Sequence, residues 1–148
     1  MKFKYFNSED TKIQDINKVQ NALSLAQNPI IVDAEYFPLL EAAENGDIFA
    51  TAELAEAFRK GRKGIPRNYN LAKYYASLML ENAEDNISLE VEALHNSGYL
   101  EYSFGNHKQA IHLYKKALFL MHNFLPPEEW TASLYSDMQK AITAIQKP

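Results

Sequence analysis

Apolar residues recur at three- and four-residue steps along most of the chain, which is the spacing of an amphipathic helix. The first such run extends from Ser8 to Gln27 and ends before Pro29, because the residue preceding a proline is disfavoured in the helical region. The same pattern predicts further helices at about residues 34–45, 47–60, 68–84, 88–104, 107–123 and 127–146. Strand-like alternation is confined to MKFKYF at the N-terminus. The chain is therefore expected to be all-α, with about seven helices joined by short turns.

Residues at the expected helix ends fit these boundaries. Asp47 and Asn68 are suited to cap helix starts, and Gly46 is suited to end the helix before Asp47. The helix at Ser88 begins without a full capping box, and Pro127 is expected at the first position of the last helix. The expected buried faces consist of Phe49, Ala52, Ala55 and Phe58 in residues 47–60, and of Trp130, Leu134, Met138, Ala141, Ile142 and Ile145 in residues 127–146.

Two helix pairs in the middle of the chain repeat one pattern. When Gly98 is placed under Ala55, Ala110 falls under Ala72 and Tyr114 falls near Tyr75. Small residues let two helices approach closely, and an aromatic ring fills the groove beside them. The connector of the first pair is longer, because GRKGIPRN stands where the second pair has only FGN.

The two pairs resemble known helical repeats. The first is similar to a Sel-one-like repeat through Ala52, Leu54, Ala55, Phe58, Gly61, Gly64, Ile65, Asn68, Tyr69, Ala72 and Tyr75. It departs from that pattern in the spacing of Gly61 and Gly64, and in having Met79-Leu80 where paired alanines are usual. The second resembles a tetratricopeptide repeat through Leu94, Gly98, Tyr102, Gly105, Ala110, Tyr114 and Ala117, although its usual closing proline is absent at His122.

The resemblance implies an α-α superhelix, a short solenoid of helix pairs. Residues 1–148 are then a single domain with an N-terminal helical extension at 1–41, a Sel-one-like unit at 42–84 and a tetratricopeptide-like unit at 88–122. The helix at 127–146 is expected to cap the open end of the solenoid.

Composition narrows the possible environments. The chain has 148 residues, of which 47% are hydrophobic and 23% charged, as is ordinary for one globular domain. Its net charge of −4 gives no general attraction to nucleic acid or to an anionic membrane. The absence of cysteine excludes disulfides, thiolate metal sites and cysteine nucleophiles. No apolar run is long enough for a signal peptide or a membrane span, so a cytoplasmic protein is expected.

The segment GRKGIPRN and its flanks concentrate five cations, namely Arg59, Lys60, Arg62, Lys63 and Arg67. Three interpretations are open: a turn between helices, a contact for an anionic partner, and a nucleic-acid patch. The segment lacks the Gly-Lys-Ser/Thr ending of a phosphate-binding Walker loop, and no strand precedes it. Cations at the end of a helix also complement its dipole, which favours the turn.

No catalytic or metal-binding constellation emerges from the sequence, and no cofactor is expected. His107 and His112 are five residues apart and so lie on different helical faces, without a carboxylate spaced to complete a metal site. No serine stands in a Gly-x-Ser-x-Gly elbow. The chain is therefore expected not to be an enzyme.

The repeat resemblance points to a partner-binding surface. In tetratricopeptide-type solenoids the first helix of each pair lines the concave face, which here implies Glu56, Arg59, Lys60, His95, Tyr99 and Tyr102. Amphipathic aromatics and arginine are favoured at protein interfaces. The alternative is that the terminal helices fold over this face and fill it.

The sequence thus predicts an intracellular protein- or peptide-binding module, a scaffold or adaptor. Its partner should carry acidic residues beside apolar ones, with no nucleic acid expected. Other possibilities are a self-associating assembly protein, including a homodimer, a toxin-neutralising (immunity) protein, and more distantly an enzyme accessory protein.

Overall fold

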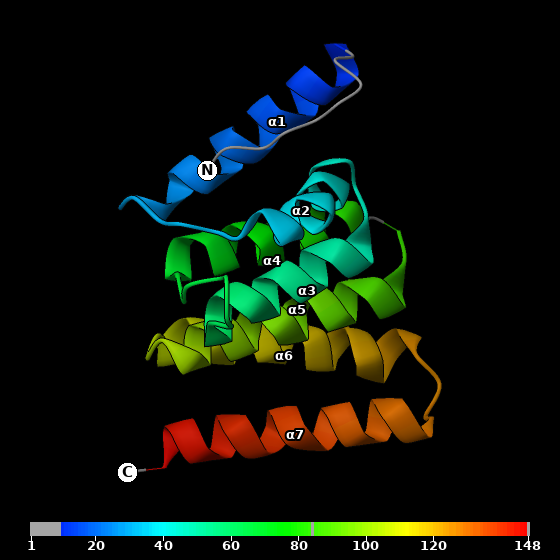
Figure 1. Ribbon diagram of the computed structural model, residues 1–148. Coiled ribbons are helices and arrows are strands. Elements are labelled where there is room, and N and C mark those ends of the chain that lie inside the picture. The colour runs from blue at the N-terminus through cyan, green and yellow to red at the C-terminus, as the bar shows by residue number, and fades with distance from the viewer. Residues whose placement is uncertain (1–9, 84, 148) are drawn as a thin grey trace. The chain divides into compact units, whose positions relative to one another are not determined.

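Helices account for nearly all regular structure in the computed structural model, which describes residues 10–83 and 85–147 (Figure 1). The helices are α1 (Asp10–Leu23), α2 (Phe37–Glu44), α3 (Ile48–Lys60), α4 (Tyr69–Ala83), α5 (Ile87–Ser103), α6 (His107–Phe124) and α7 (Glu129–Gln146). Single 3-10 turns occupy Ser24–Ala26 and Ala34–Tyr36, and the described residues hold no strand. The start expected for the first helix, at Ser8, lies outside the described residues.

The expected fold class is confirmed, because the described chain is all-α and its consecutive helices pack on one another. The helices fall into two compact units, Met1–Asn82 and Ala83–Pro148, which are described separately below. Within each unit the packing follows chain order, as in an α-α superhelix: α1 packs on α2 and α2 on α3, while α5 packs on α6 and α6 on α7.

Three helices begin in the same way, with an Asp or Asn side chain that accepts a hydrogen bond from the amide three residues later. These N-caps are Asp47, Asn68 and Asn86, whose Oδ1 atoms accept from Ala50, Leu71 and Leu89 at 3.1, 3.0 and 3.1 Å. The first two match the sequence prediction. The third shows that α5 begins before Ser88, because Asn86 supplies the cap that the serine position lacked.

The last helix begins later than predicted. Its N-cap is Glu128, which forms a capping box with Thr131, so Pro127 precedes the helix and does not occupy its first position. The Glu128 amide donates to the Thr131 hydroxyl at 2.8 Å. Thr131 is buried, which makes this start a fixed part of the packing between α6 and α7.

The core of unit 1 forms around a stack of two aromatic rings. Phe58 of α3 and Tyr75 of α4 lie with centroids 5.8 Å apart and planes only 5° from parallel. Both are fully buried, whereas Phe49, which was expected on the same face as Phe58, is 84% exposed. The reason is geometric: nine residues at about 100° each place two side chains on opposite sides of a helix.

In unit 2, α5 and α6 approach closely where Gly98 faces Tyr114. A Cβ atom on Gly98 would lie 2.6 Å from Tyr114 Cε1, so only glycine fits this contact. Tyr114 is buried together with Ala110 and Ala117 on α6, as the repeat alignment predicts. The last helix, α7, packs on α6 and runs antiparallel to it (Figure 1), and its Met138 and Ile142 are buried.

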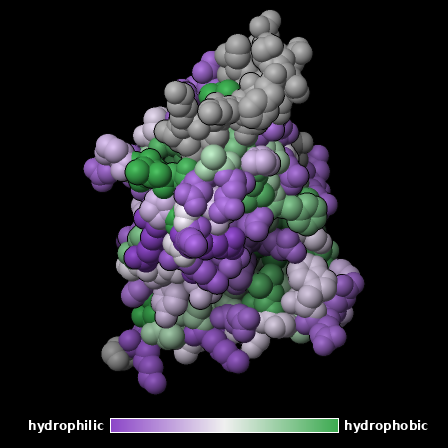
Figure 2. Space-filling model, viewed as in Figure 1, coloured by the Kyte–Doolittle hydropathy of each residue, from purple (hydrophilic) through white to green (hydrophobic). Residues whose placement is uncertain are grey.

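Hydrophilic residues cover much of the face shown in Figure 2, and hydrophobic residues interrupt them in separate patches. The large hydrophobic side chains that are exposed include Ile31, Phe49, Tyr99, Tyr102, Phe119, Phe124 and Trp130.

A glutamate is partly buried in unit 1. Glu44, at the end of α2, accepts a hydrogen bond through Oε1 from the Tyr74 hydroxyl at 2.8 Å. Its Oε2 is buried without a hydrogen-bond partner, and so is the hydroxyl of the adjacent Tyr75. Burial raises the pKa of Glu44, and this outweighs the opposing effects of the Tyr74 hydrogen bond and of Lys18.

This raised pKa gives a testable pH dependence. The folded state binds the Glu44 proton more tightly than the unfolded chain does, so this group lowers the free energy of unfolding as the pH rises above about 4.5. We expect Glu44→Gln to flatten the decline, since glutamine keeps the acceptor for Tyr74 without the charge. Urea unfolding of both proteins across a pH series measures this. Parallel pH profiles for the two proteins would contradict it.

Candidate functional site

Residues 61–68, with the sequence GRKGIPRN, form the turn between α3 and α4. Arg62 and Ile65 exchange two backbone hydrogen bonds with N···O distances of 2.8 and 3.0 Å. Gly61 and Gly64 have φ values of 78° and 88°, in the left-handed region that glycine adopts most readily. The Gly61 amide also donates to Ala57 O at 2.7 Å. A phosphate-binding loop needs amides directed at its ligand, whereas these three amides are donated within the protein.

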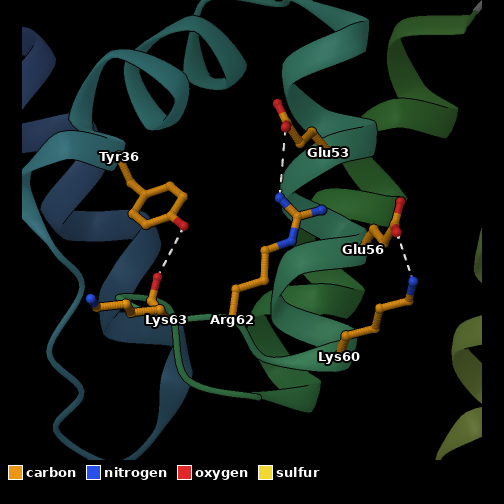
Figure 3. Close-up of polar contacts among 6 residues, drawn as sticks. All are labelled: Tyr36, Glu53, Glu56, Lys60, Arg62 and Lys63. Atoms are coloured by element: carbon orange, nitrogen blue, oxygen red, sulfur yellow. Dashed lines mark hydrogen bonds and ion pairs between the residues drawn. The ribbon is translucent and has the colours of Figure 1, made fainter.

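The turn is also held by the segment that precedes α2. The Asp33 amide donates to Gly64 O at 2.8 Å, and the Tyr36 hydroxyl donates to Lys63 O at 3.1 Å (Figure 3). Ile65, the next residue of the turn, is buried. The geometry therefore favours a turn built into the unit over a free loop that closes on a ligand.

The charges at the end of α3 are partly balanced. Lys60 Nζ lies 3.0 Å from Glu56 Oε1, and Arg62 Nη1 lies 3.6 Å from Glu53 Oε1 (Figure 3). The hydrogen bond from Lys60 lowers the pKa of Glu56 and keeps that carboxylate charged. Arg59 is half-buried. Because Lys60 and Arg62 each lie beside a glutamate, the end of α3 carries a smaller excess of positive charge than the number of its cations indicates.

The three site residues predicted on α5 lie along one stripe of that helix. His95, Tyr99 and Tyr102 are spaced four and three residues apart, which places them on one face. The rings of His95 and Tyr99 meet edge to face with centroids 6.3 Å apart, and Tyr102 lies 5.5 Å from the His107 ring. Tyr99 and Tyr102 remain 43% and 39% exposed. These tyrosines are thus preorganised side chains on the surface of unit 2.

The neighbouring face of α5 explains why the stripe faces outward. Leu94 and Gly98 are buried, and Gly98 sits on the Tyr114 ring. Glu101 is also buried, and its Oε1 accepts from Asn106 Nδ2 at 2.9 Å, which ties α5 to the turn before α6. Because these contacts fix the rotation of α5, the tyrosines of the stripe are held at the surface.

A groove lies beside the stripe, between α5 and α7. Its cavity has a volume of about 360 Å³ and is lined by Glu92, His95 and Asn96 from α5 and by Trp130, Ser133, Leu134 and Asp137 from α7. We call it the α5–α7 groove. Trp130 was expected among the buried residues of α7, but it is 39% exposed and lines this groove, of which α7 forms one wall.

Sequence reasoning missed the α7 wall of this groove. The signal was present, because Trp130, Ser133, Leu134 and Asp137 follow the spacing of one helical face. Apolar spacing nevertheless predicts this face to be core, because Trp130 and Leu134 are in phase with Met138. The six predicted site residues are divided equally between the two units, and a single surface shared by both sets stays a prediction.

In the part of the chain that the structure describes, no helix is both long and apolar enough to cross a membrane. Likewise, no three histidine, aspartate or glutamate side chains among the described residues gather in a way that could hold a metal ion.

No family model, curated protein or solved structure matches the chain.

Proposed function

We propose that the chain is a non-enzymatic, cytoplasmic protein-binding module of the helical-repeat type, which receives a polypeptide segment of a partner on the α5 stripe and the α5–α7 groove. The observation that carries this proposal is the pair of exposed tyrosines, Tyr99 and Tyr102, on a helix that also lines an open groove.

The chemistry of this surface suits protein recognition. Tyrosine and tryptophan offer large contact areas with few rotatable bonds, and they are enriched among the residues that dominate binding energy. Here Tyr99, Tyr102 and Trp130 each expose more than a third of their surface, at 43%, 39% and 39%. Their orientations are restrained by ring contacts of Tyr99 and Tyr102 and by the hydrogen bond from Trp130 Nε1 to Glu128 Oε2 at 2.8 Å. Little side-chain entropy is then lost when a partner binds.

The packing within each unit supports the repeat interpretation. The residues aligned as equivalent, Ala72 with Ala110 and Tyr75 with Tyr114, are all buried. We therefore retain the proposal of a Sel-one-like unit followed by a tetratricopeptide-like unit, in which α3 and α5 would be equivalent first helices. In this proposal Arg59 and Lys60 contact acidic residues of the partner, with Glu56 beside them at the same surface, and the α5 stripe holds its apolar residues.

Differential affinity capture tests the proposal. Tagged wild type, a Tyr99→Ala/Tyr102→Ala variant and a Phe119→Ala control are used to capture proteins from the native cell, with mass spectrometry as the readout. Phe119 is an equally suitable exposed aromatic, at 55%, but it lies on α6 outside the groove. We expect proteins that are retained by wild type and control and lost with the tyrosine variant.

The tyrosine variant must first give the circular dichroism spectrum and melting curve of a folded protein, because its side chains are exposed and should not be needed for folding. If the folded variant then captures the same proteins as wild type, the α5 stripe is not the binding surface.

A further inference from the structure

We infer that the α5–α7 groove holds an arginine or lysine side chain of the partner segment, flanked by apolar residues. This inference rests on the proposed function and adds to it the chemistry of the group that enters the groove. It differs from the acidic preference proposed for the end of α3, since the two preferences concern surfaces in different units.

Besides the imidazole of His95, the ionisable groups that line the groove are carboxylates. Glu92 on α5 and Asp137 on α7 both line it, and the lining contains no lysine or arginine. Both carboxylates are exposed, and within the described residues neither has an ion-pair partner. Two like charges on opposite walls of one groove favour a cation between them.

Trp130 supplies the second element of recognition. Its indole lines the groove, and its Nε1–H is already donated to Glu128 Oε2 at 2.8 Å, so the ring has no remaining hydrogen-bond donor to offer a ligand. A tryptophan ring also attracts ammonium and guanidinium groups that stack on its face, through the cation–π interaction. The bonded Glu128 carboxylate adds a third negative charge beside the ring.

Leu134 supplies the apolar part of the lining, one helical turn after Trp130. An arginine or lysine has a long aliphatic stem that packs on such a surface while its charged end meets the carboxylates. An acidic side chain in the same place would face Glu92 and Asp137 without compensation. The occupant that fits is therefore a basic residue between apolar neighbours.

The chain provides its own reporter for this site, because Trp130 is its single tryptophan. Selective excitation of Trp130 during titration with short synthetic peptides measures occupancy. Three peptides are compared, identical except that the central residue, between leucines, is arginine, citrulline or glutamate. Citrulline keeps the shape of arginine without its charge.

We expect the arginine peptide to change Trp130 fluorescence and to bind at least about threefold more tightly than the citrulline peptide, with the preference shrinking as salt rises. Asp137→Asn should remove most of that preference. The control Asp85→Asn removes an exposed carboxylate of the same unit that does not line the groove, and should leave the preference unchanged.

The inference is overturned if the arginine peptide does not bind, if the glutamate peptide binds as tightly, or if Asp137→Asn keeps the full arginine preference. The proposed function is tested separately, by whether capture of a partner requires Tyr99 and Tyr102. A captured partner that still requires Tyr99 and Tyr102 would leave the binding module intact and remove only the basic side chain from the groove.

Discussion

Replacing Gly98 with leucine is expected to lower the free energy of unfolding by about 1–3 kcal/mol, through overpacking of the contact between α5 and α6. A Cβ atom at this position would lie 2.6 and 2.7 Å from Tyr114 Cε1 and Cδ1. Tyr114 is only 2% exposed, so its ring has no open space into which it can move. Chemical unfolding followed by circular dichroism measures the effect.

The substitution Gly98→Ala distinguishes the steric effect of this contact on stability from the effect of helix propensity. In an exposed helix, alanine is more stable than glycine by about 1 kcal/mol. Here we expect Gly98→Ala to destabilise instead, and to do so less when Tyr114 is replaced by leucine, which removes the ring atoms that the new methyl group meets. A Gly98→Ala protein that is more stable than wild type would show that α5 and α6 do not touch at this point.

Gly64→Val is expected to cost about 1–3 kcal/mol, because a β-branched residue strongly resists a left-handed backbone conformation. Gly64 has φ 88°, and a Cβ atom there would lie 2.5 Å from Asp33 Oδ2. The substitution therefore strains the turn and also disturbs the segment whose Asp33 amide donates to Gly64 O. Thermal and urea unfolding report the loss.

Two controls isolate the causes of this loss. Gly105 has a similar φ of 83° but nothing within 4 Å of its Cβ position, so Gly105→Ala should cost less than Gly64→Ala. Replacing Arg62 and Lys63 by serine should change stability by no more than about 0.5 kcal/mol, because both are exposed surface charges. If the serine variant unfolds, the charges of the turn are structural and the interpretation as a simple connector is wrong.

The helical organisation could be predicted because it depends on local signals. The caps at Asp47 and Asn68 follow from side-chain chemistry within a few residues, and the contact between Gly98 and Tyr114 follows from the alignment of the two helix pairs. Which face of a helix is buried depends on the helices packed around it, and the buried faces were predicted less well than the helices themselves. Phe49 was assigned to the core of α3, although it lies opposite Phe58 and is 84% exposed.

In the candidate site, too, some features follow from the sequence and others depend on packing. The sequence placed Tyr99 and Tyr102 on the concave face of a repeat and left open whether the terminal helices fill that face; in the structure both side chains are exposed. The balancing of Lys60 by Glu56 depends on rotamers, and the α7 wall of the groove depends on how α7 packs against α6. Apolar spacing places Trp130 and Leu134 on one helical face, but it does not show whether that face is buried or lines a groove.

The measurement that tests the central claim most directly is a calorimetric titration of a captured partner, with stopped-flow kinetics for the rates, using wild type, Tyr99→Ala, Tyr102→Ala and the control Phe119→Ala. We expect each tyrosine substitution to weaken binding by at least about 1 kcal/mol, mostly through faster dissociation, while Phe119→Ala binds like wild type. Arg59→Ser should instead slow association and reduce the salt dependence. Folded tyrosine variants that bind the partner with wild-type affinity would contradict the assignment of the α5 stripe as the binding surface.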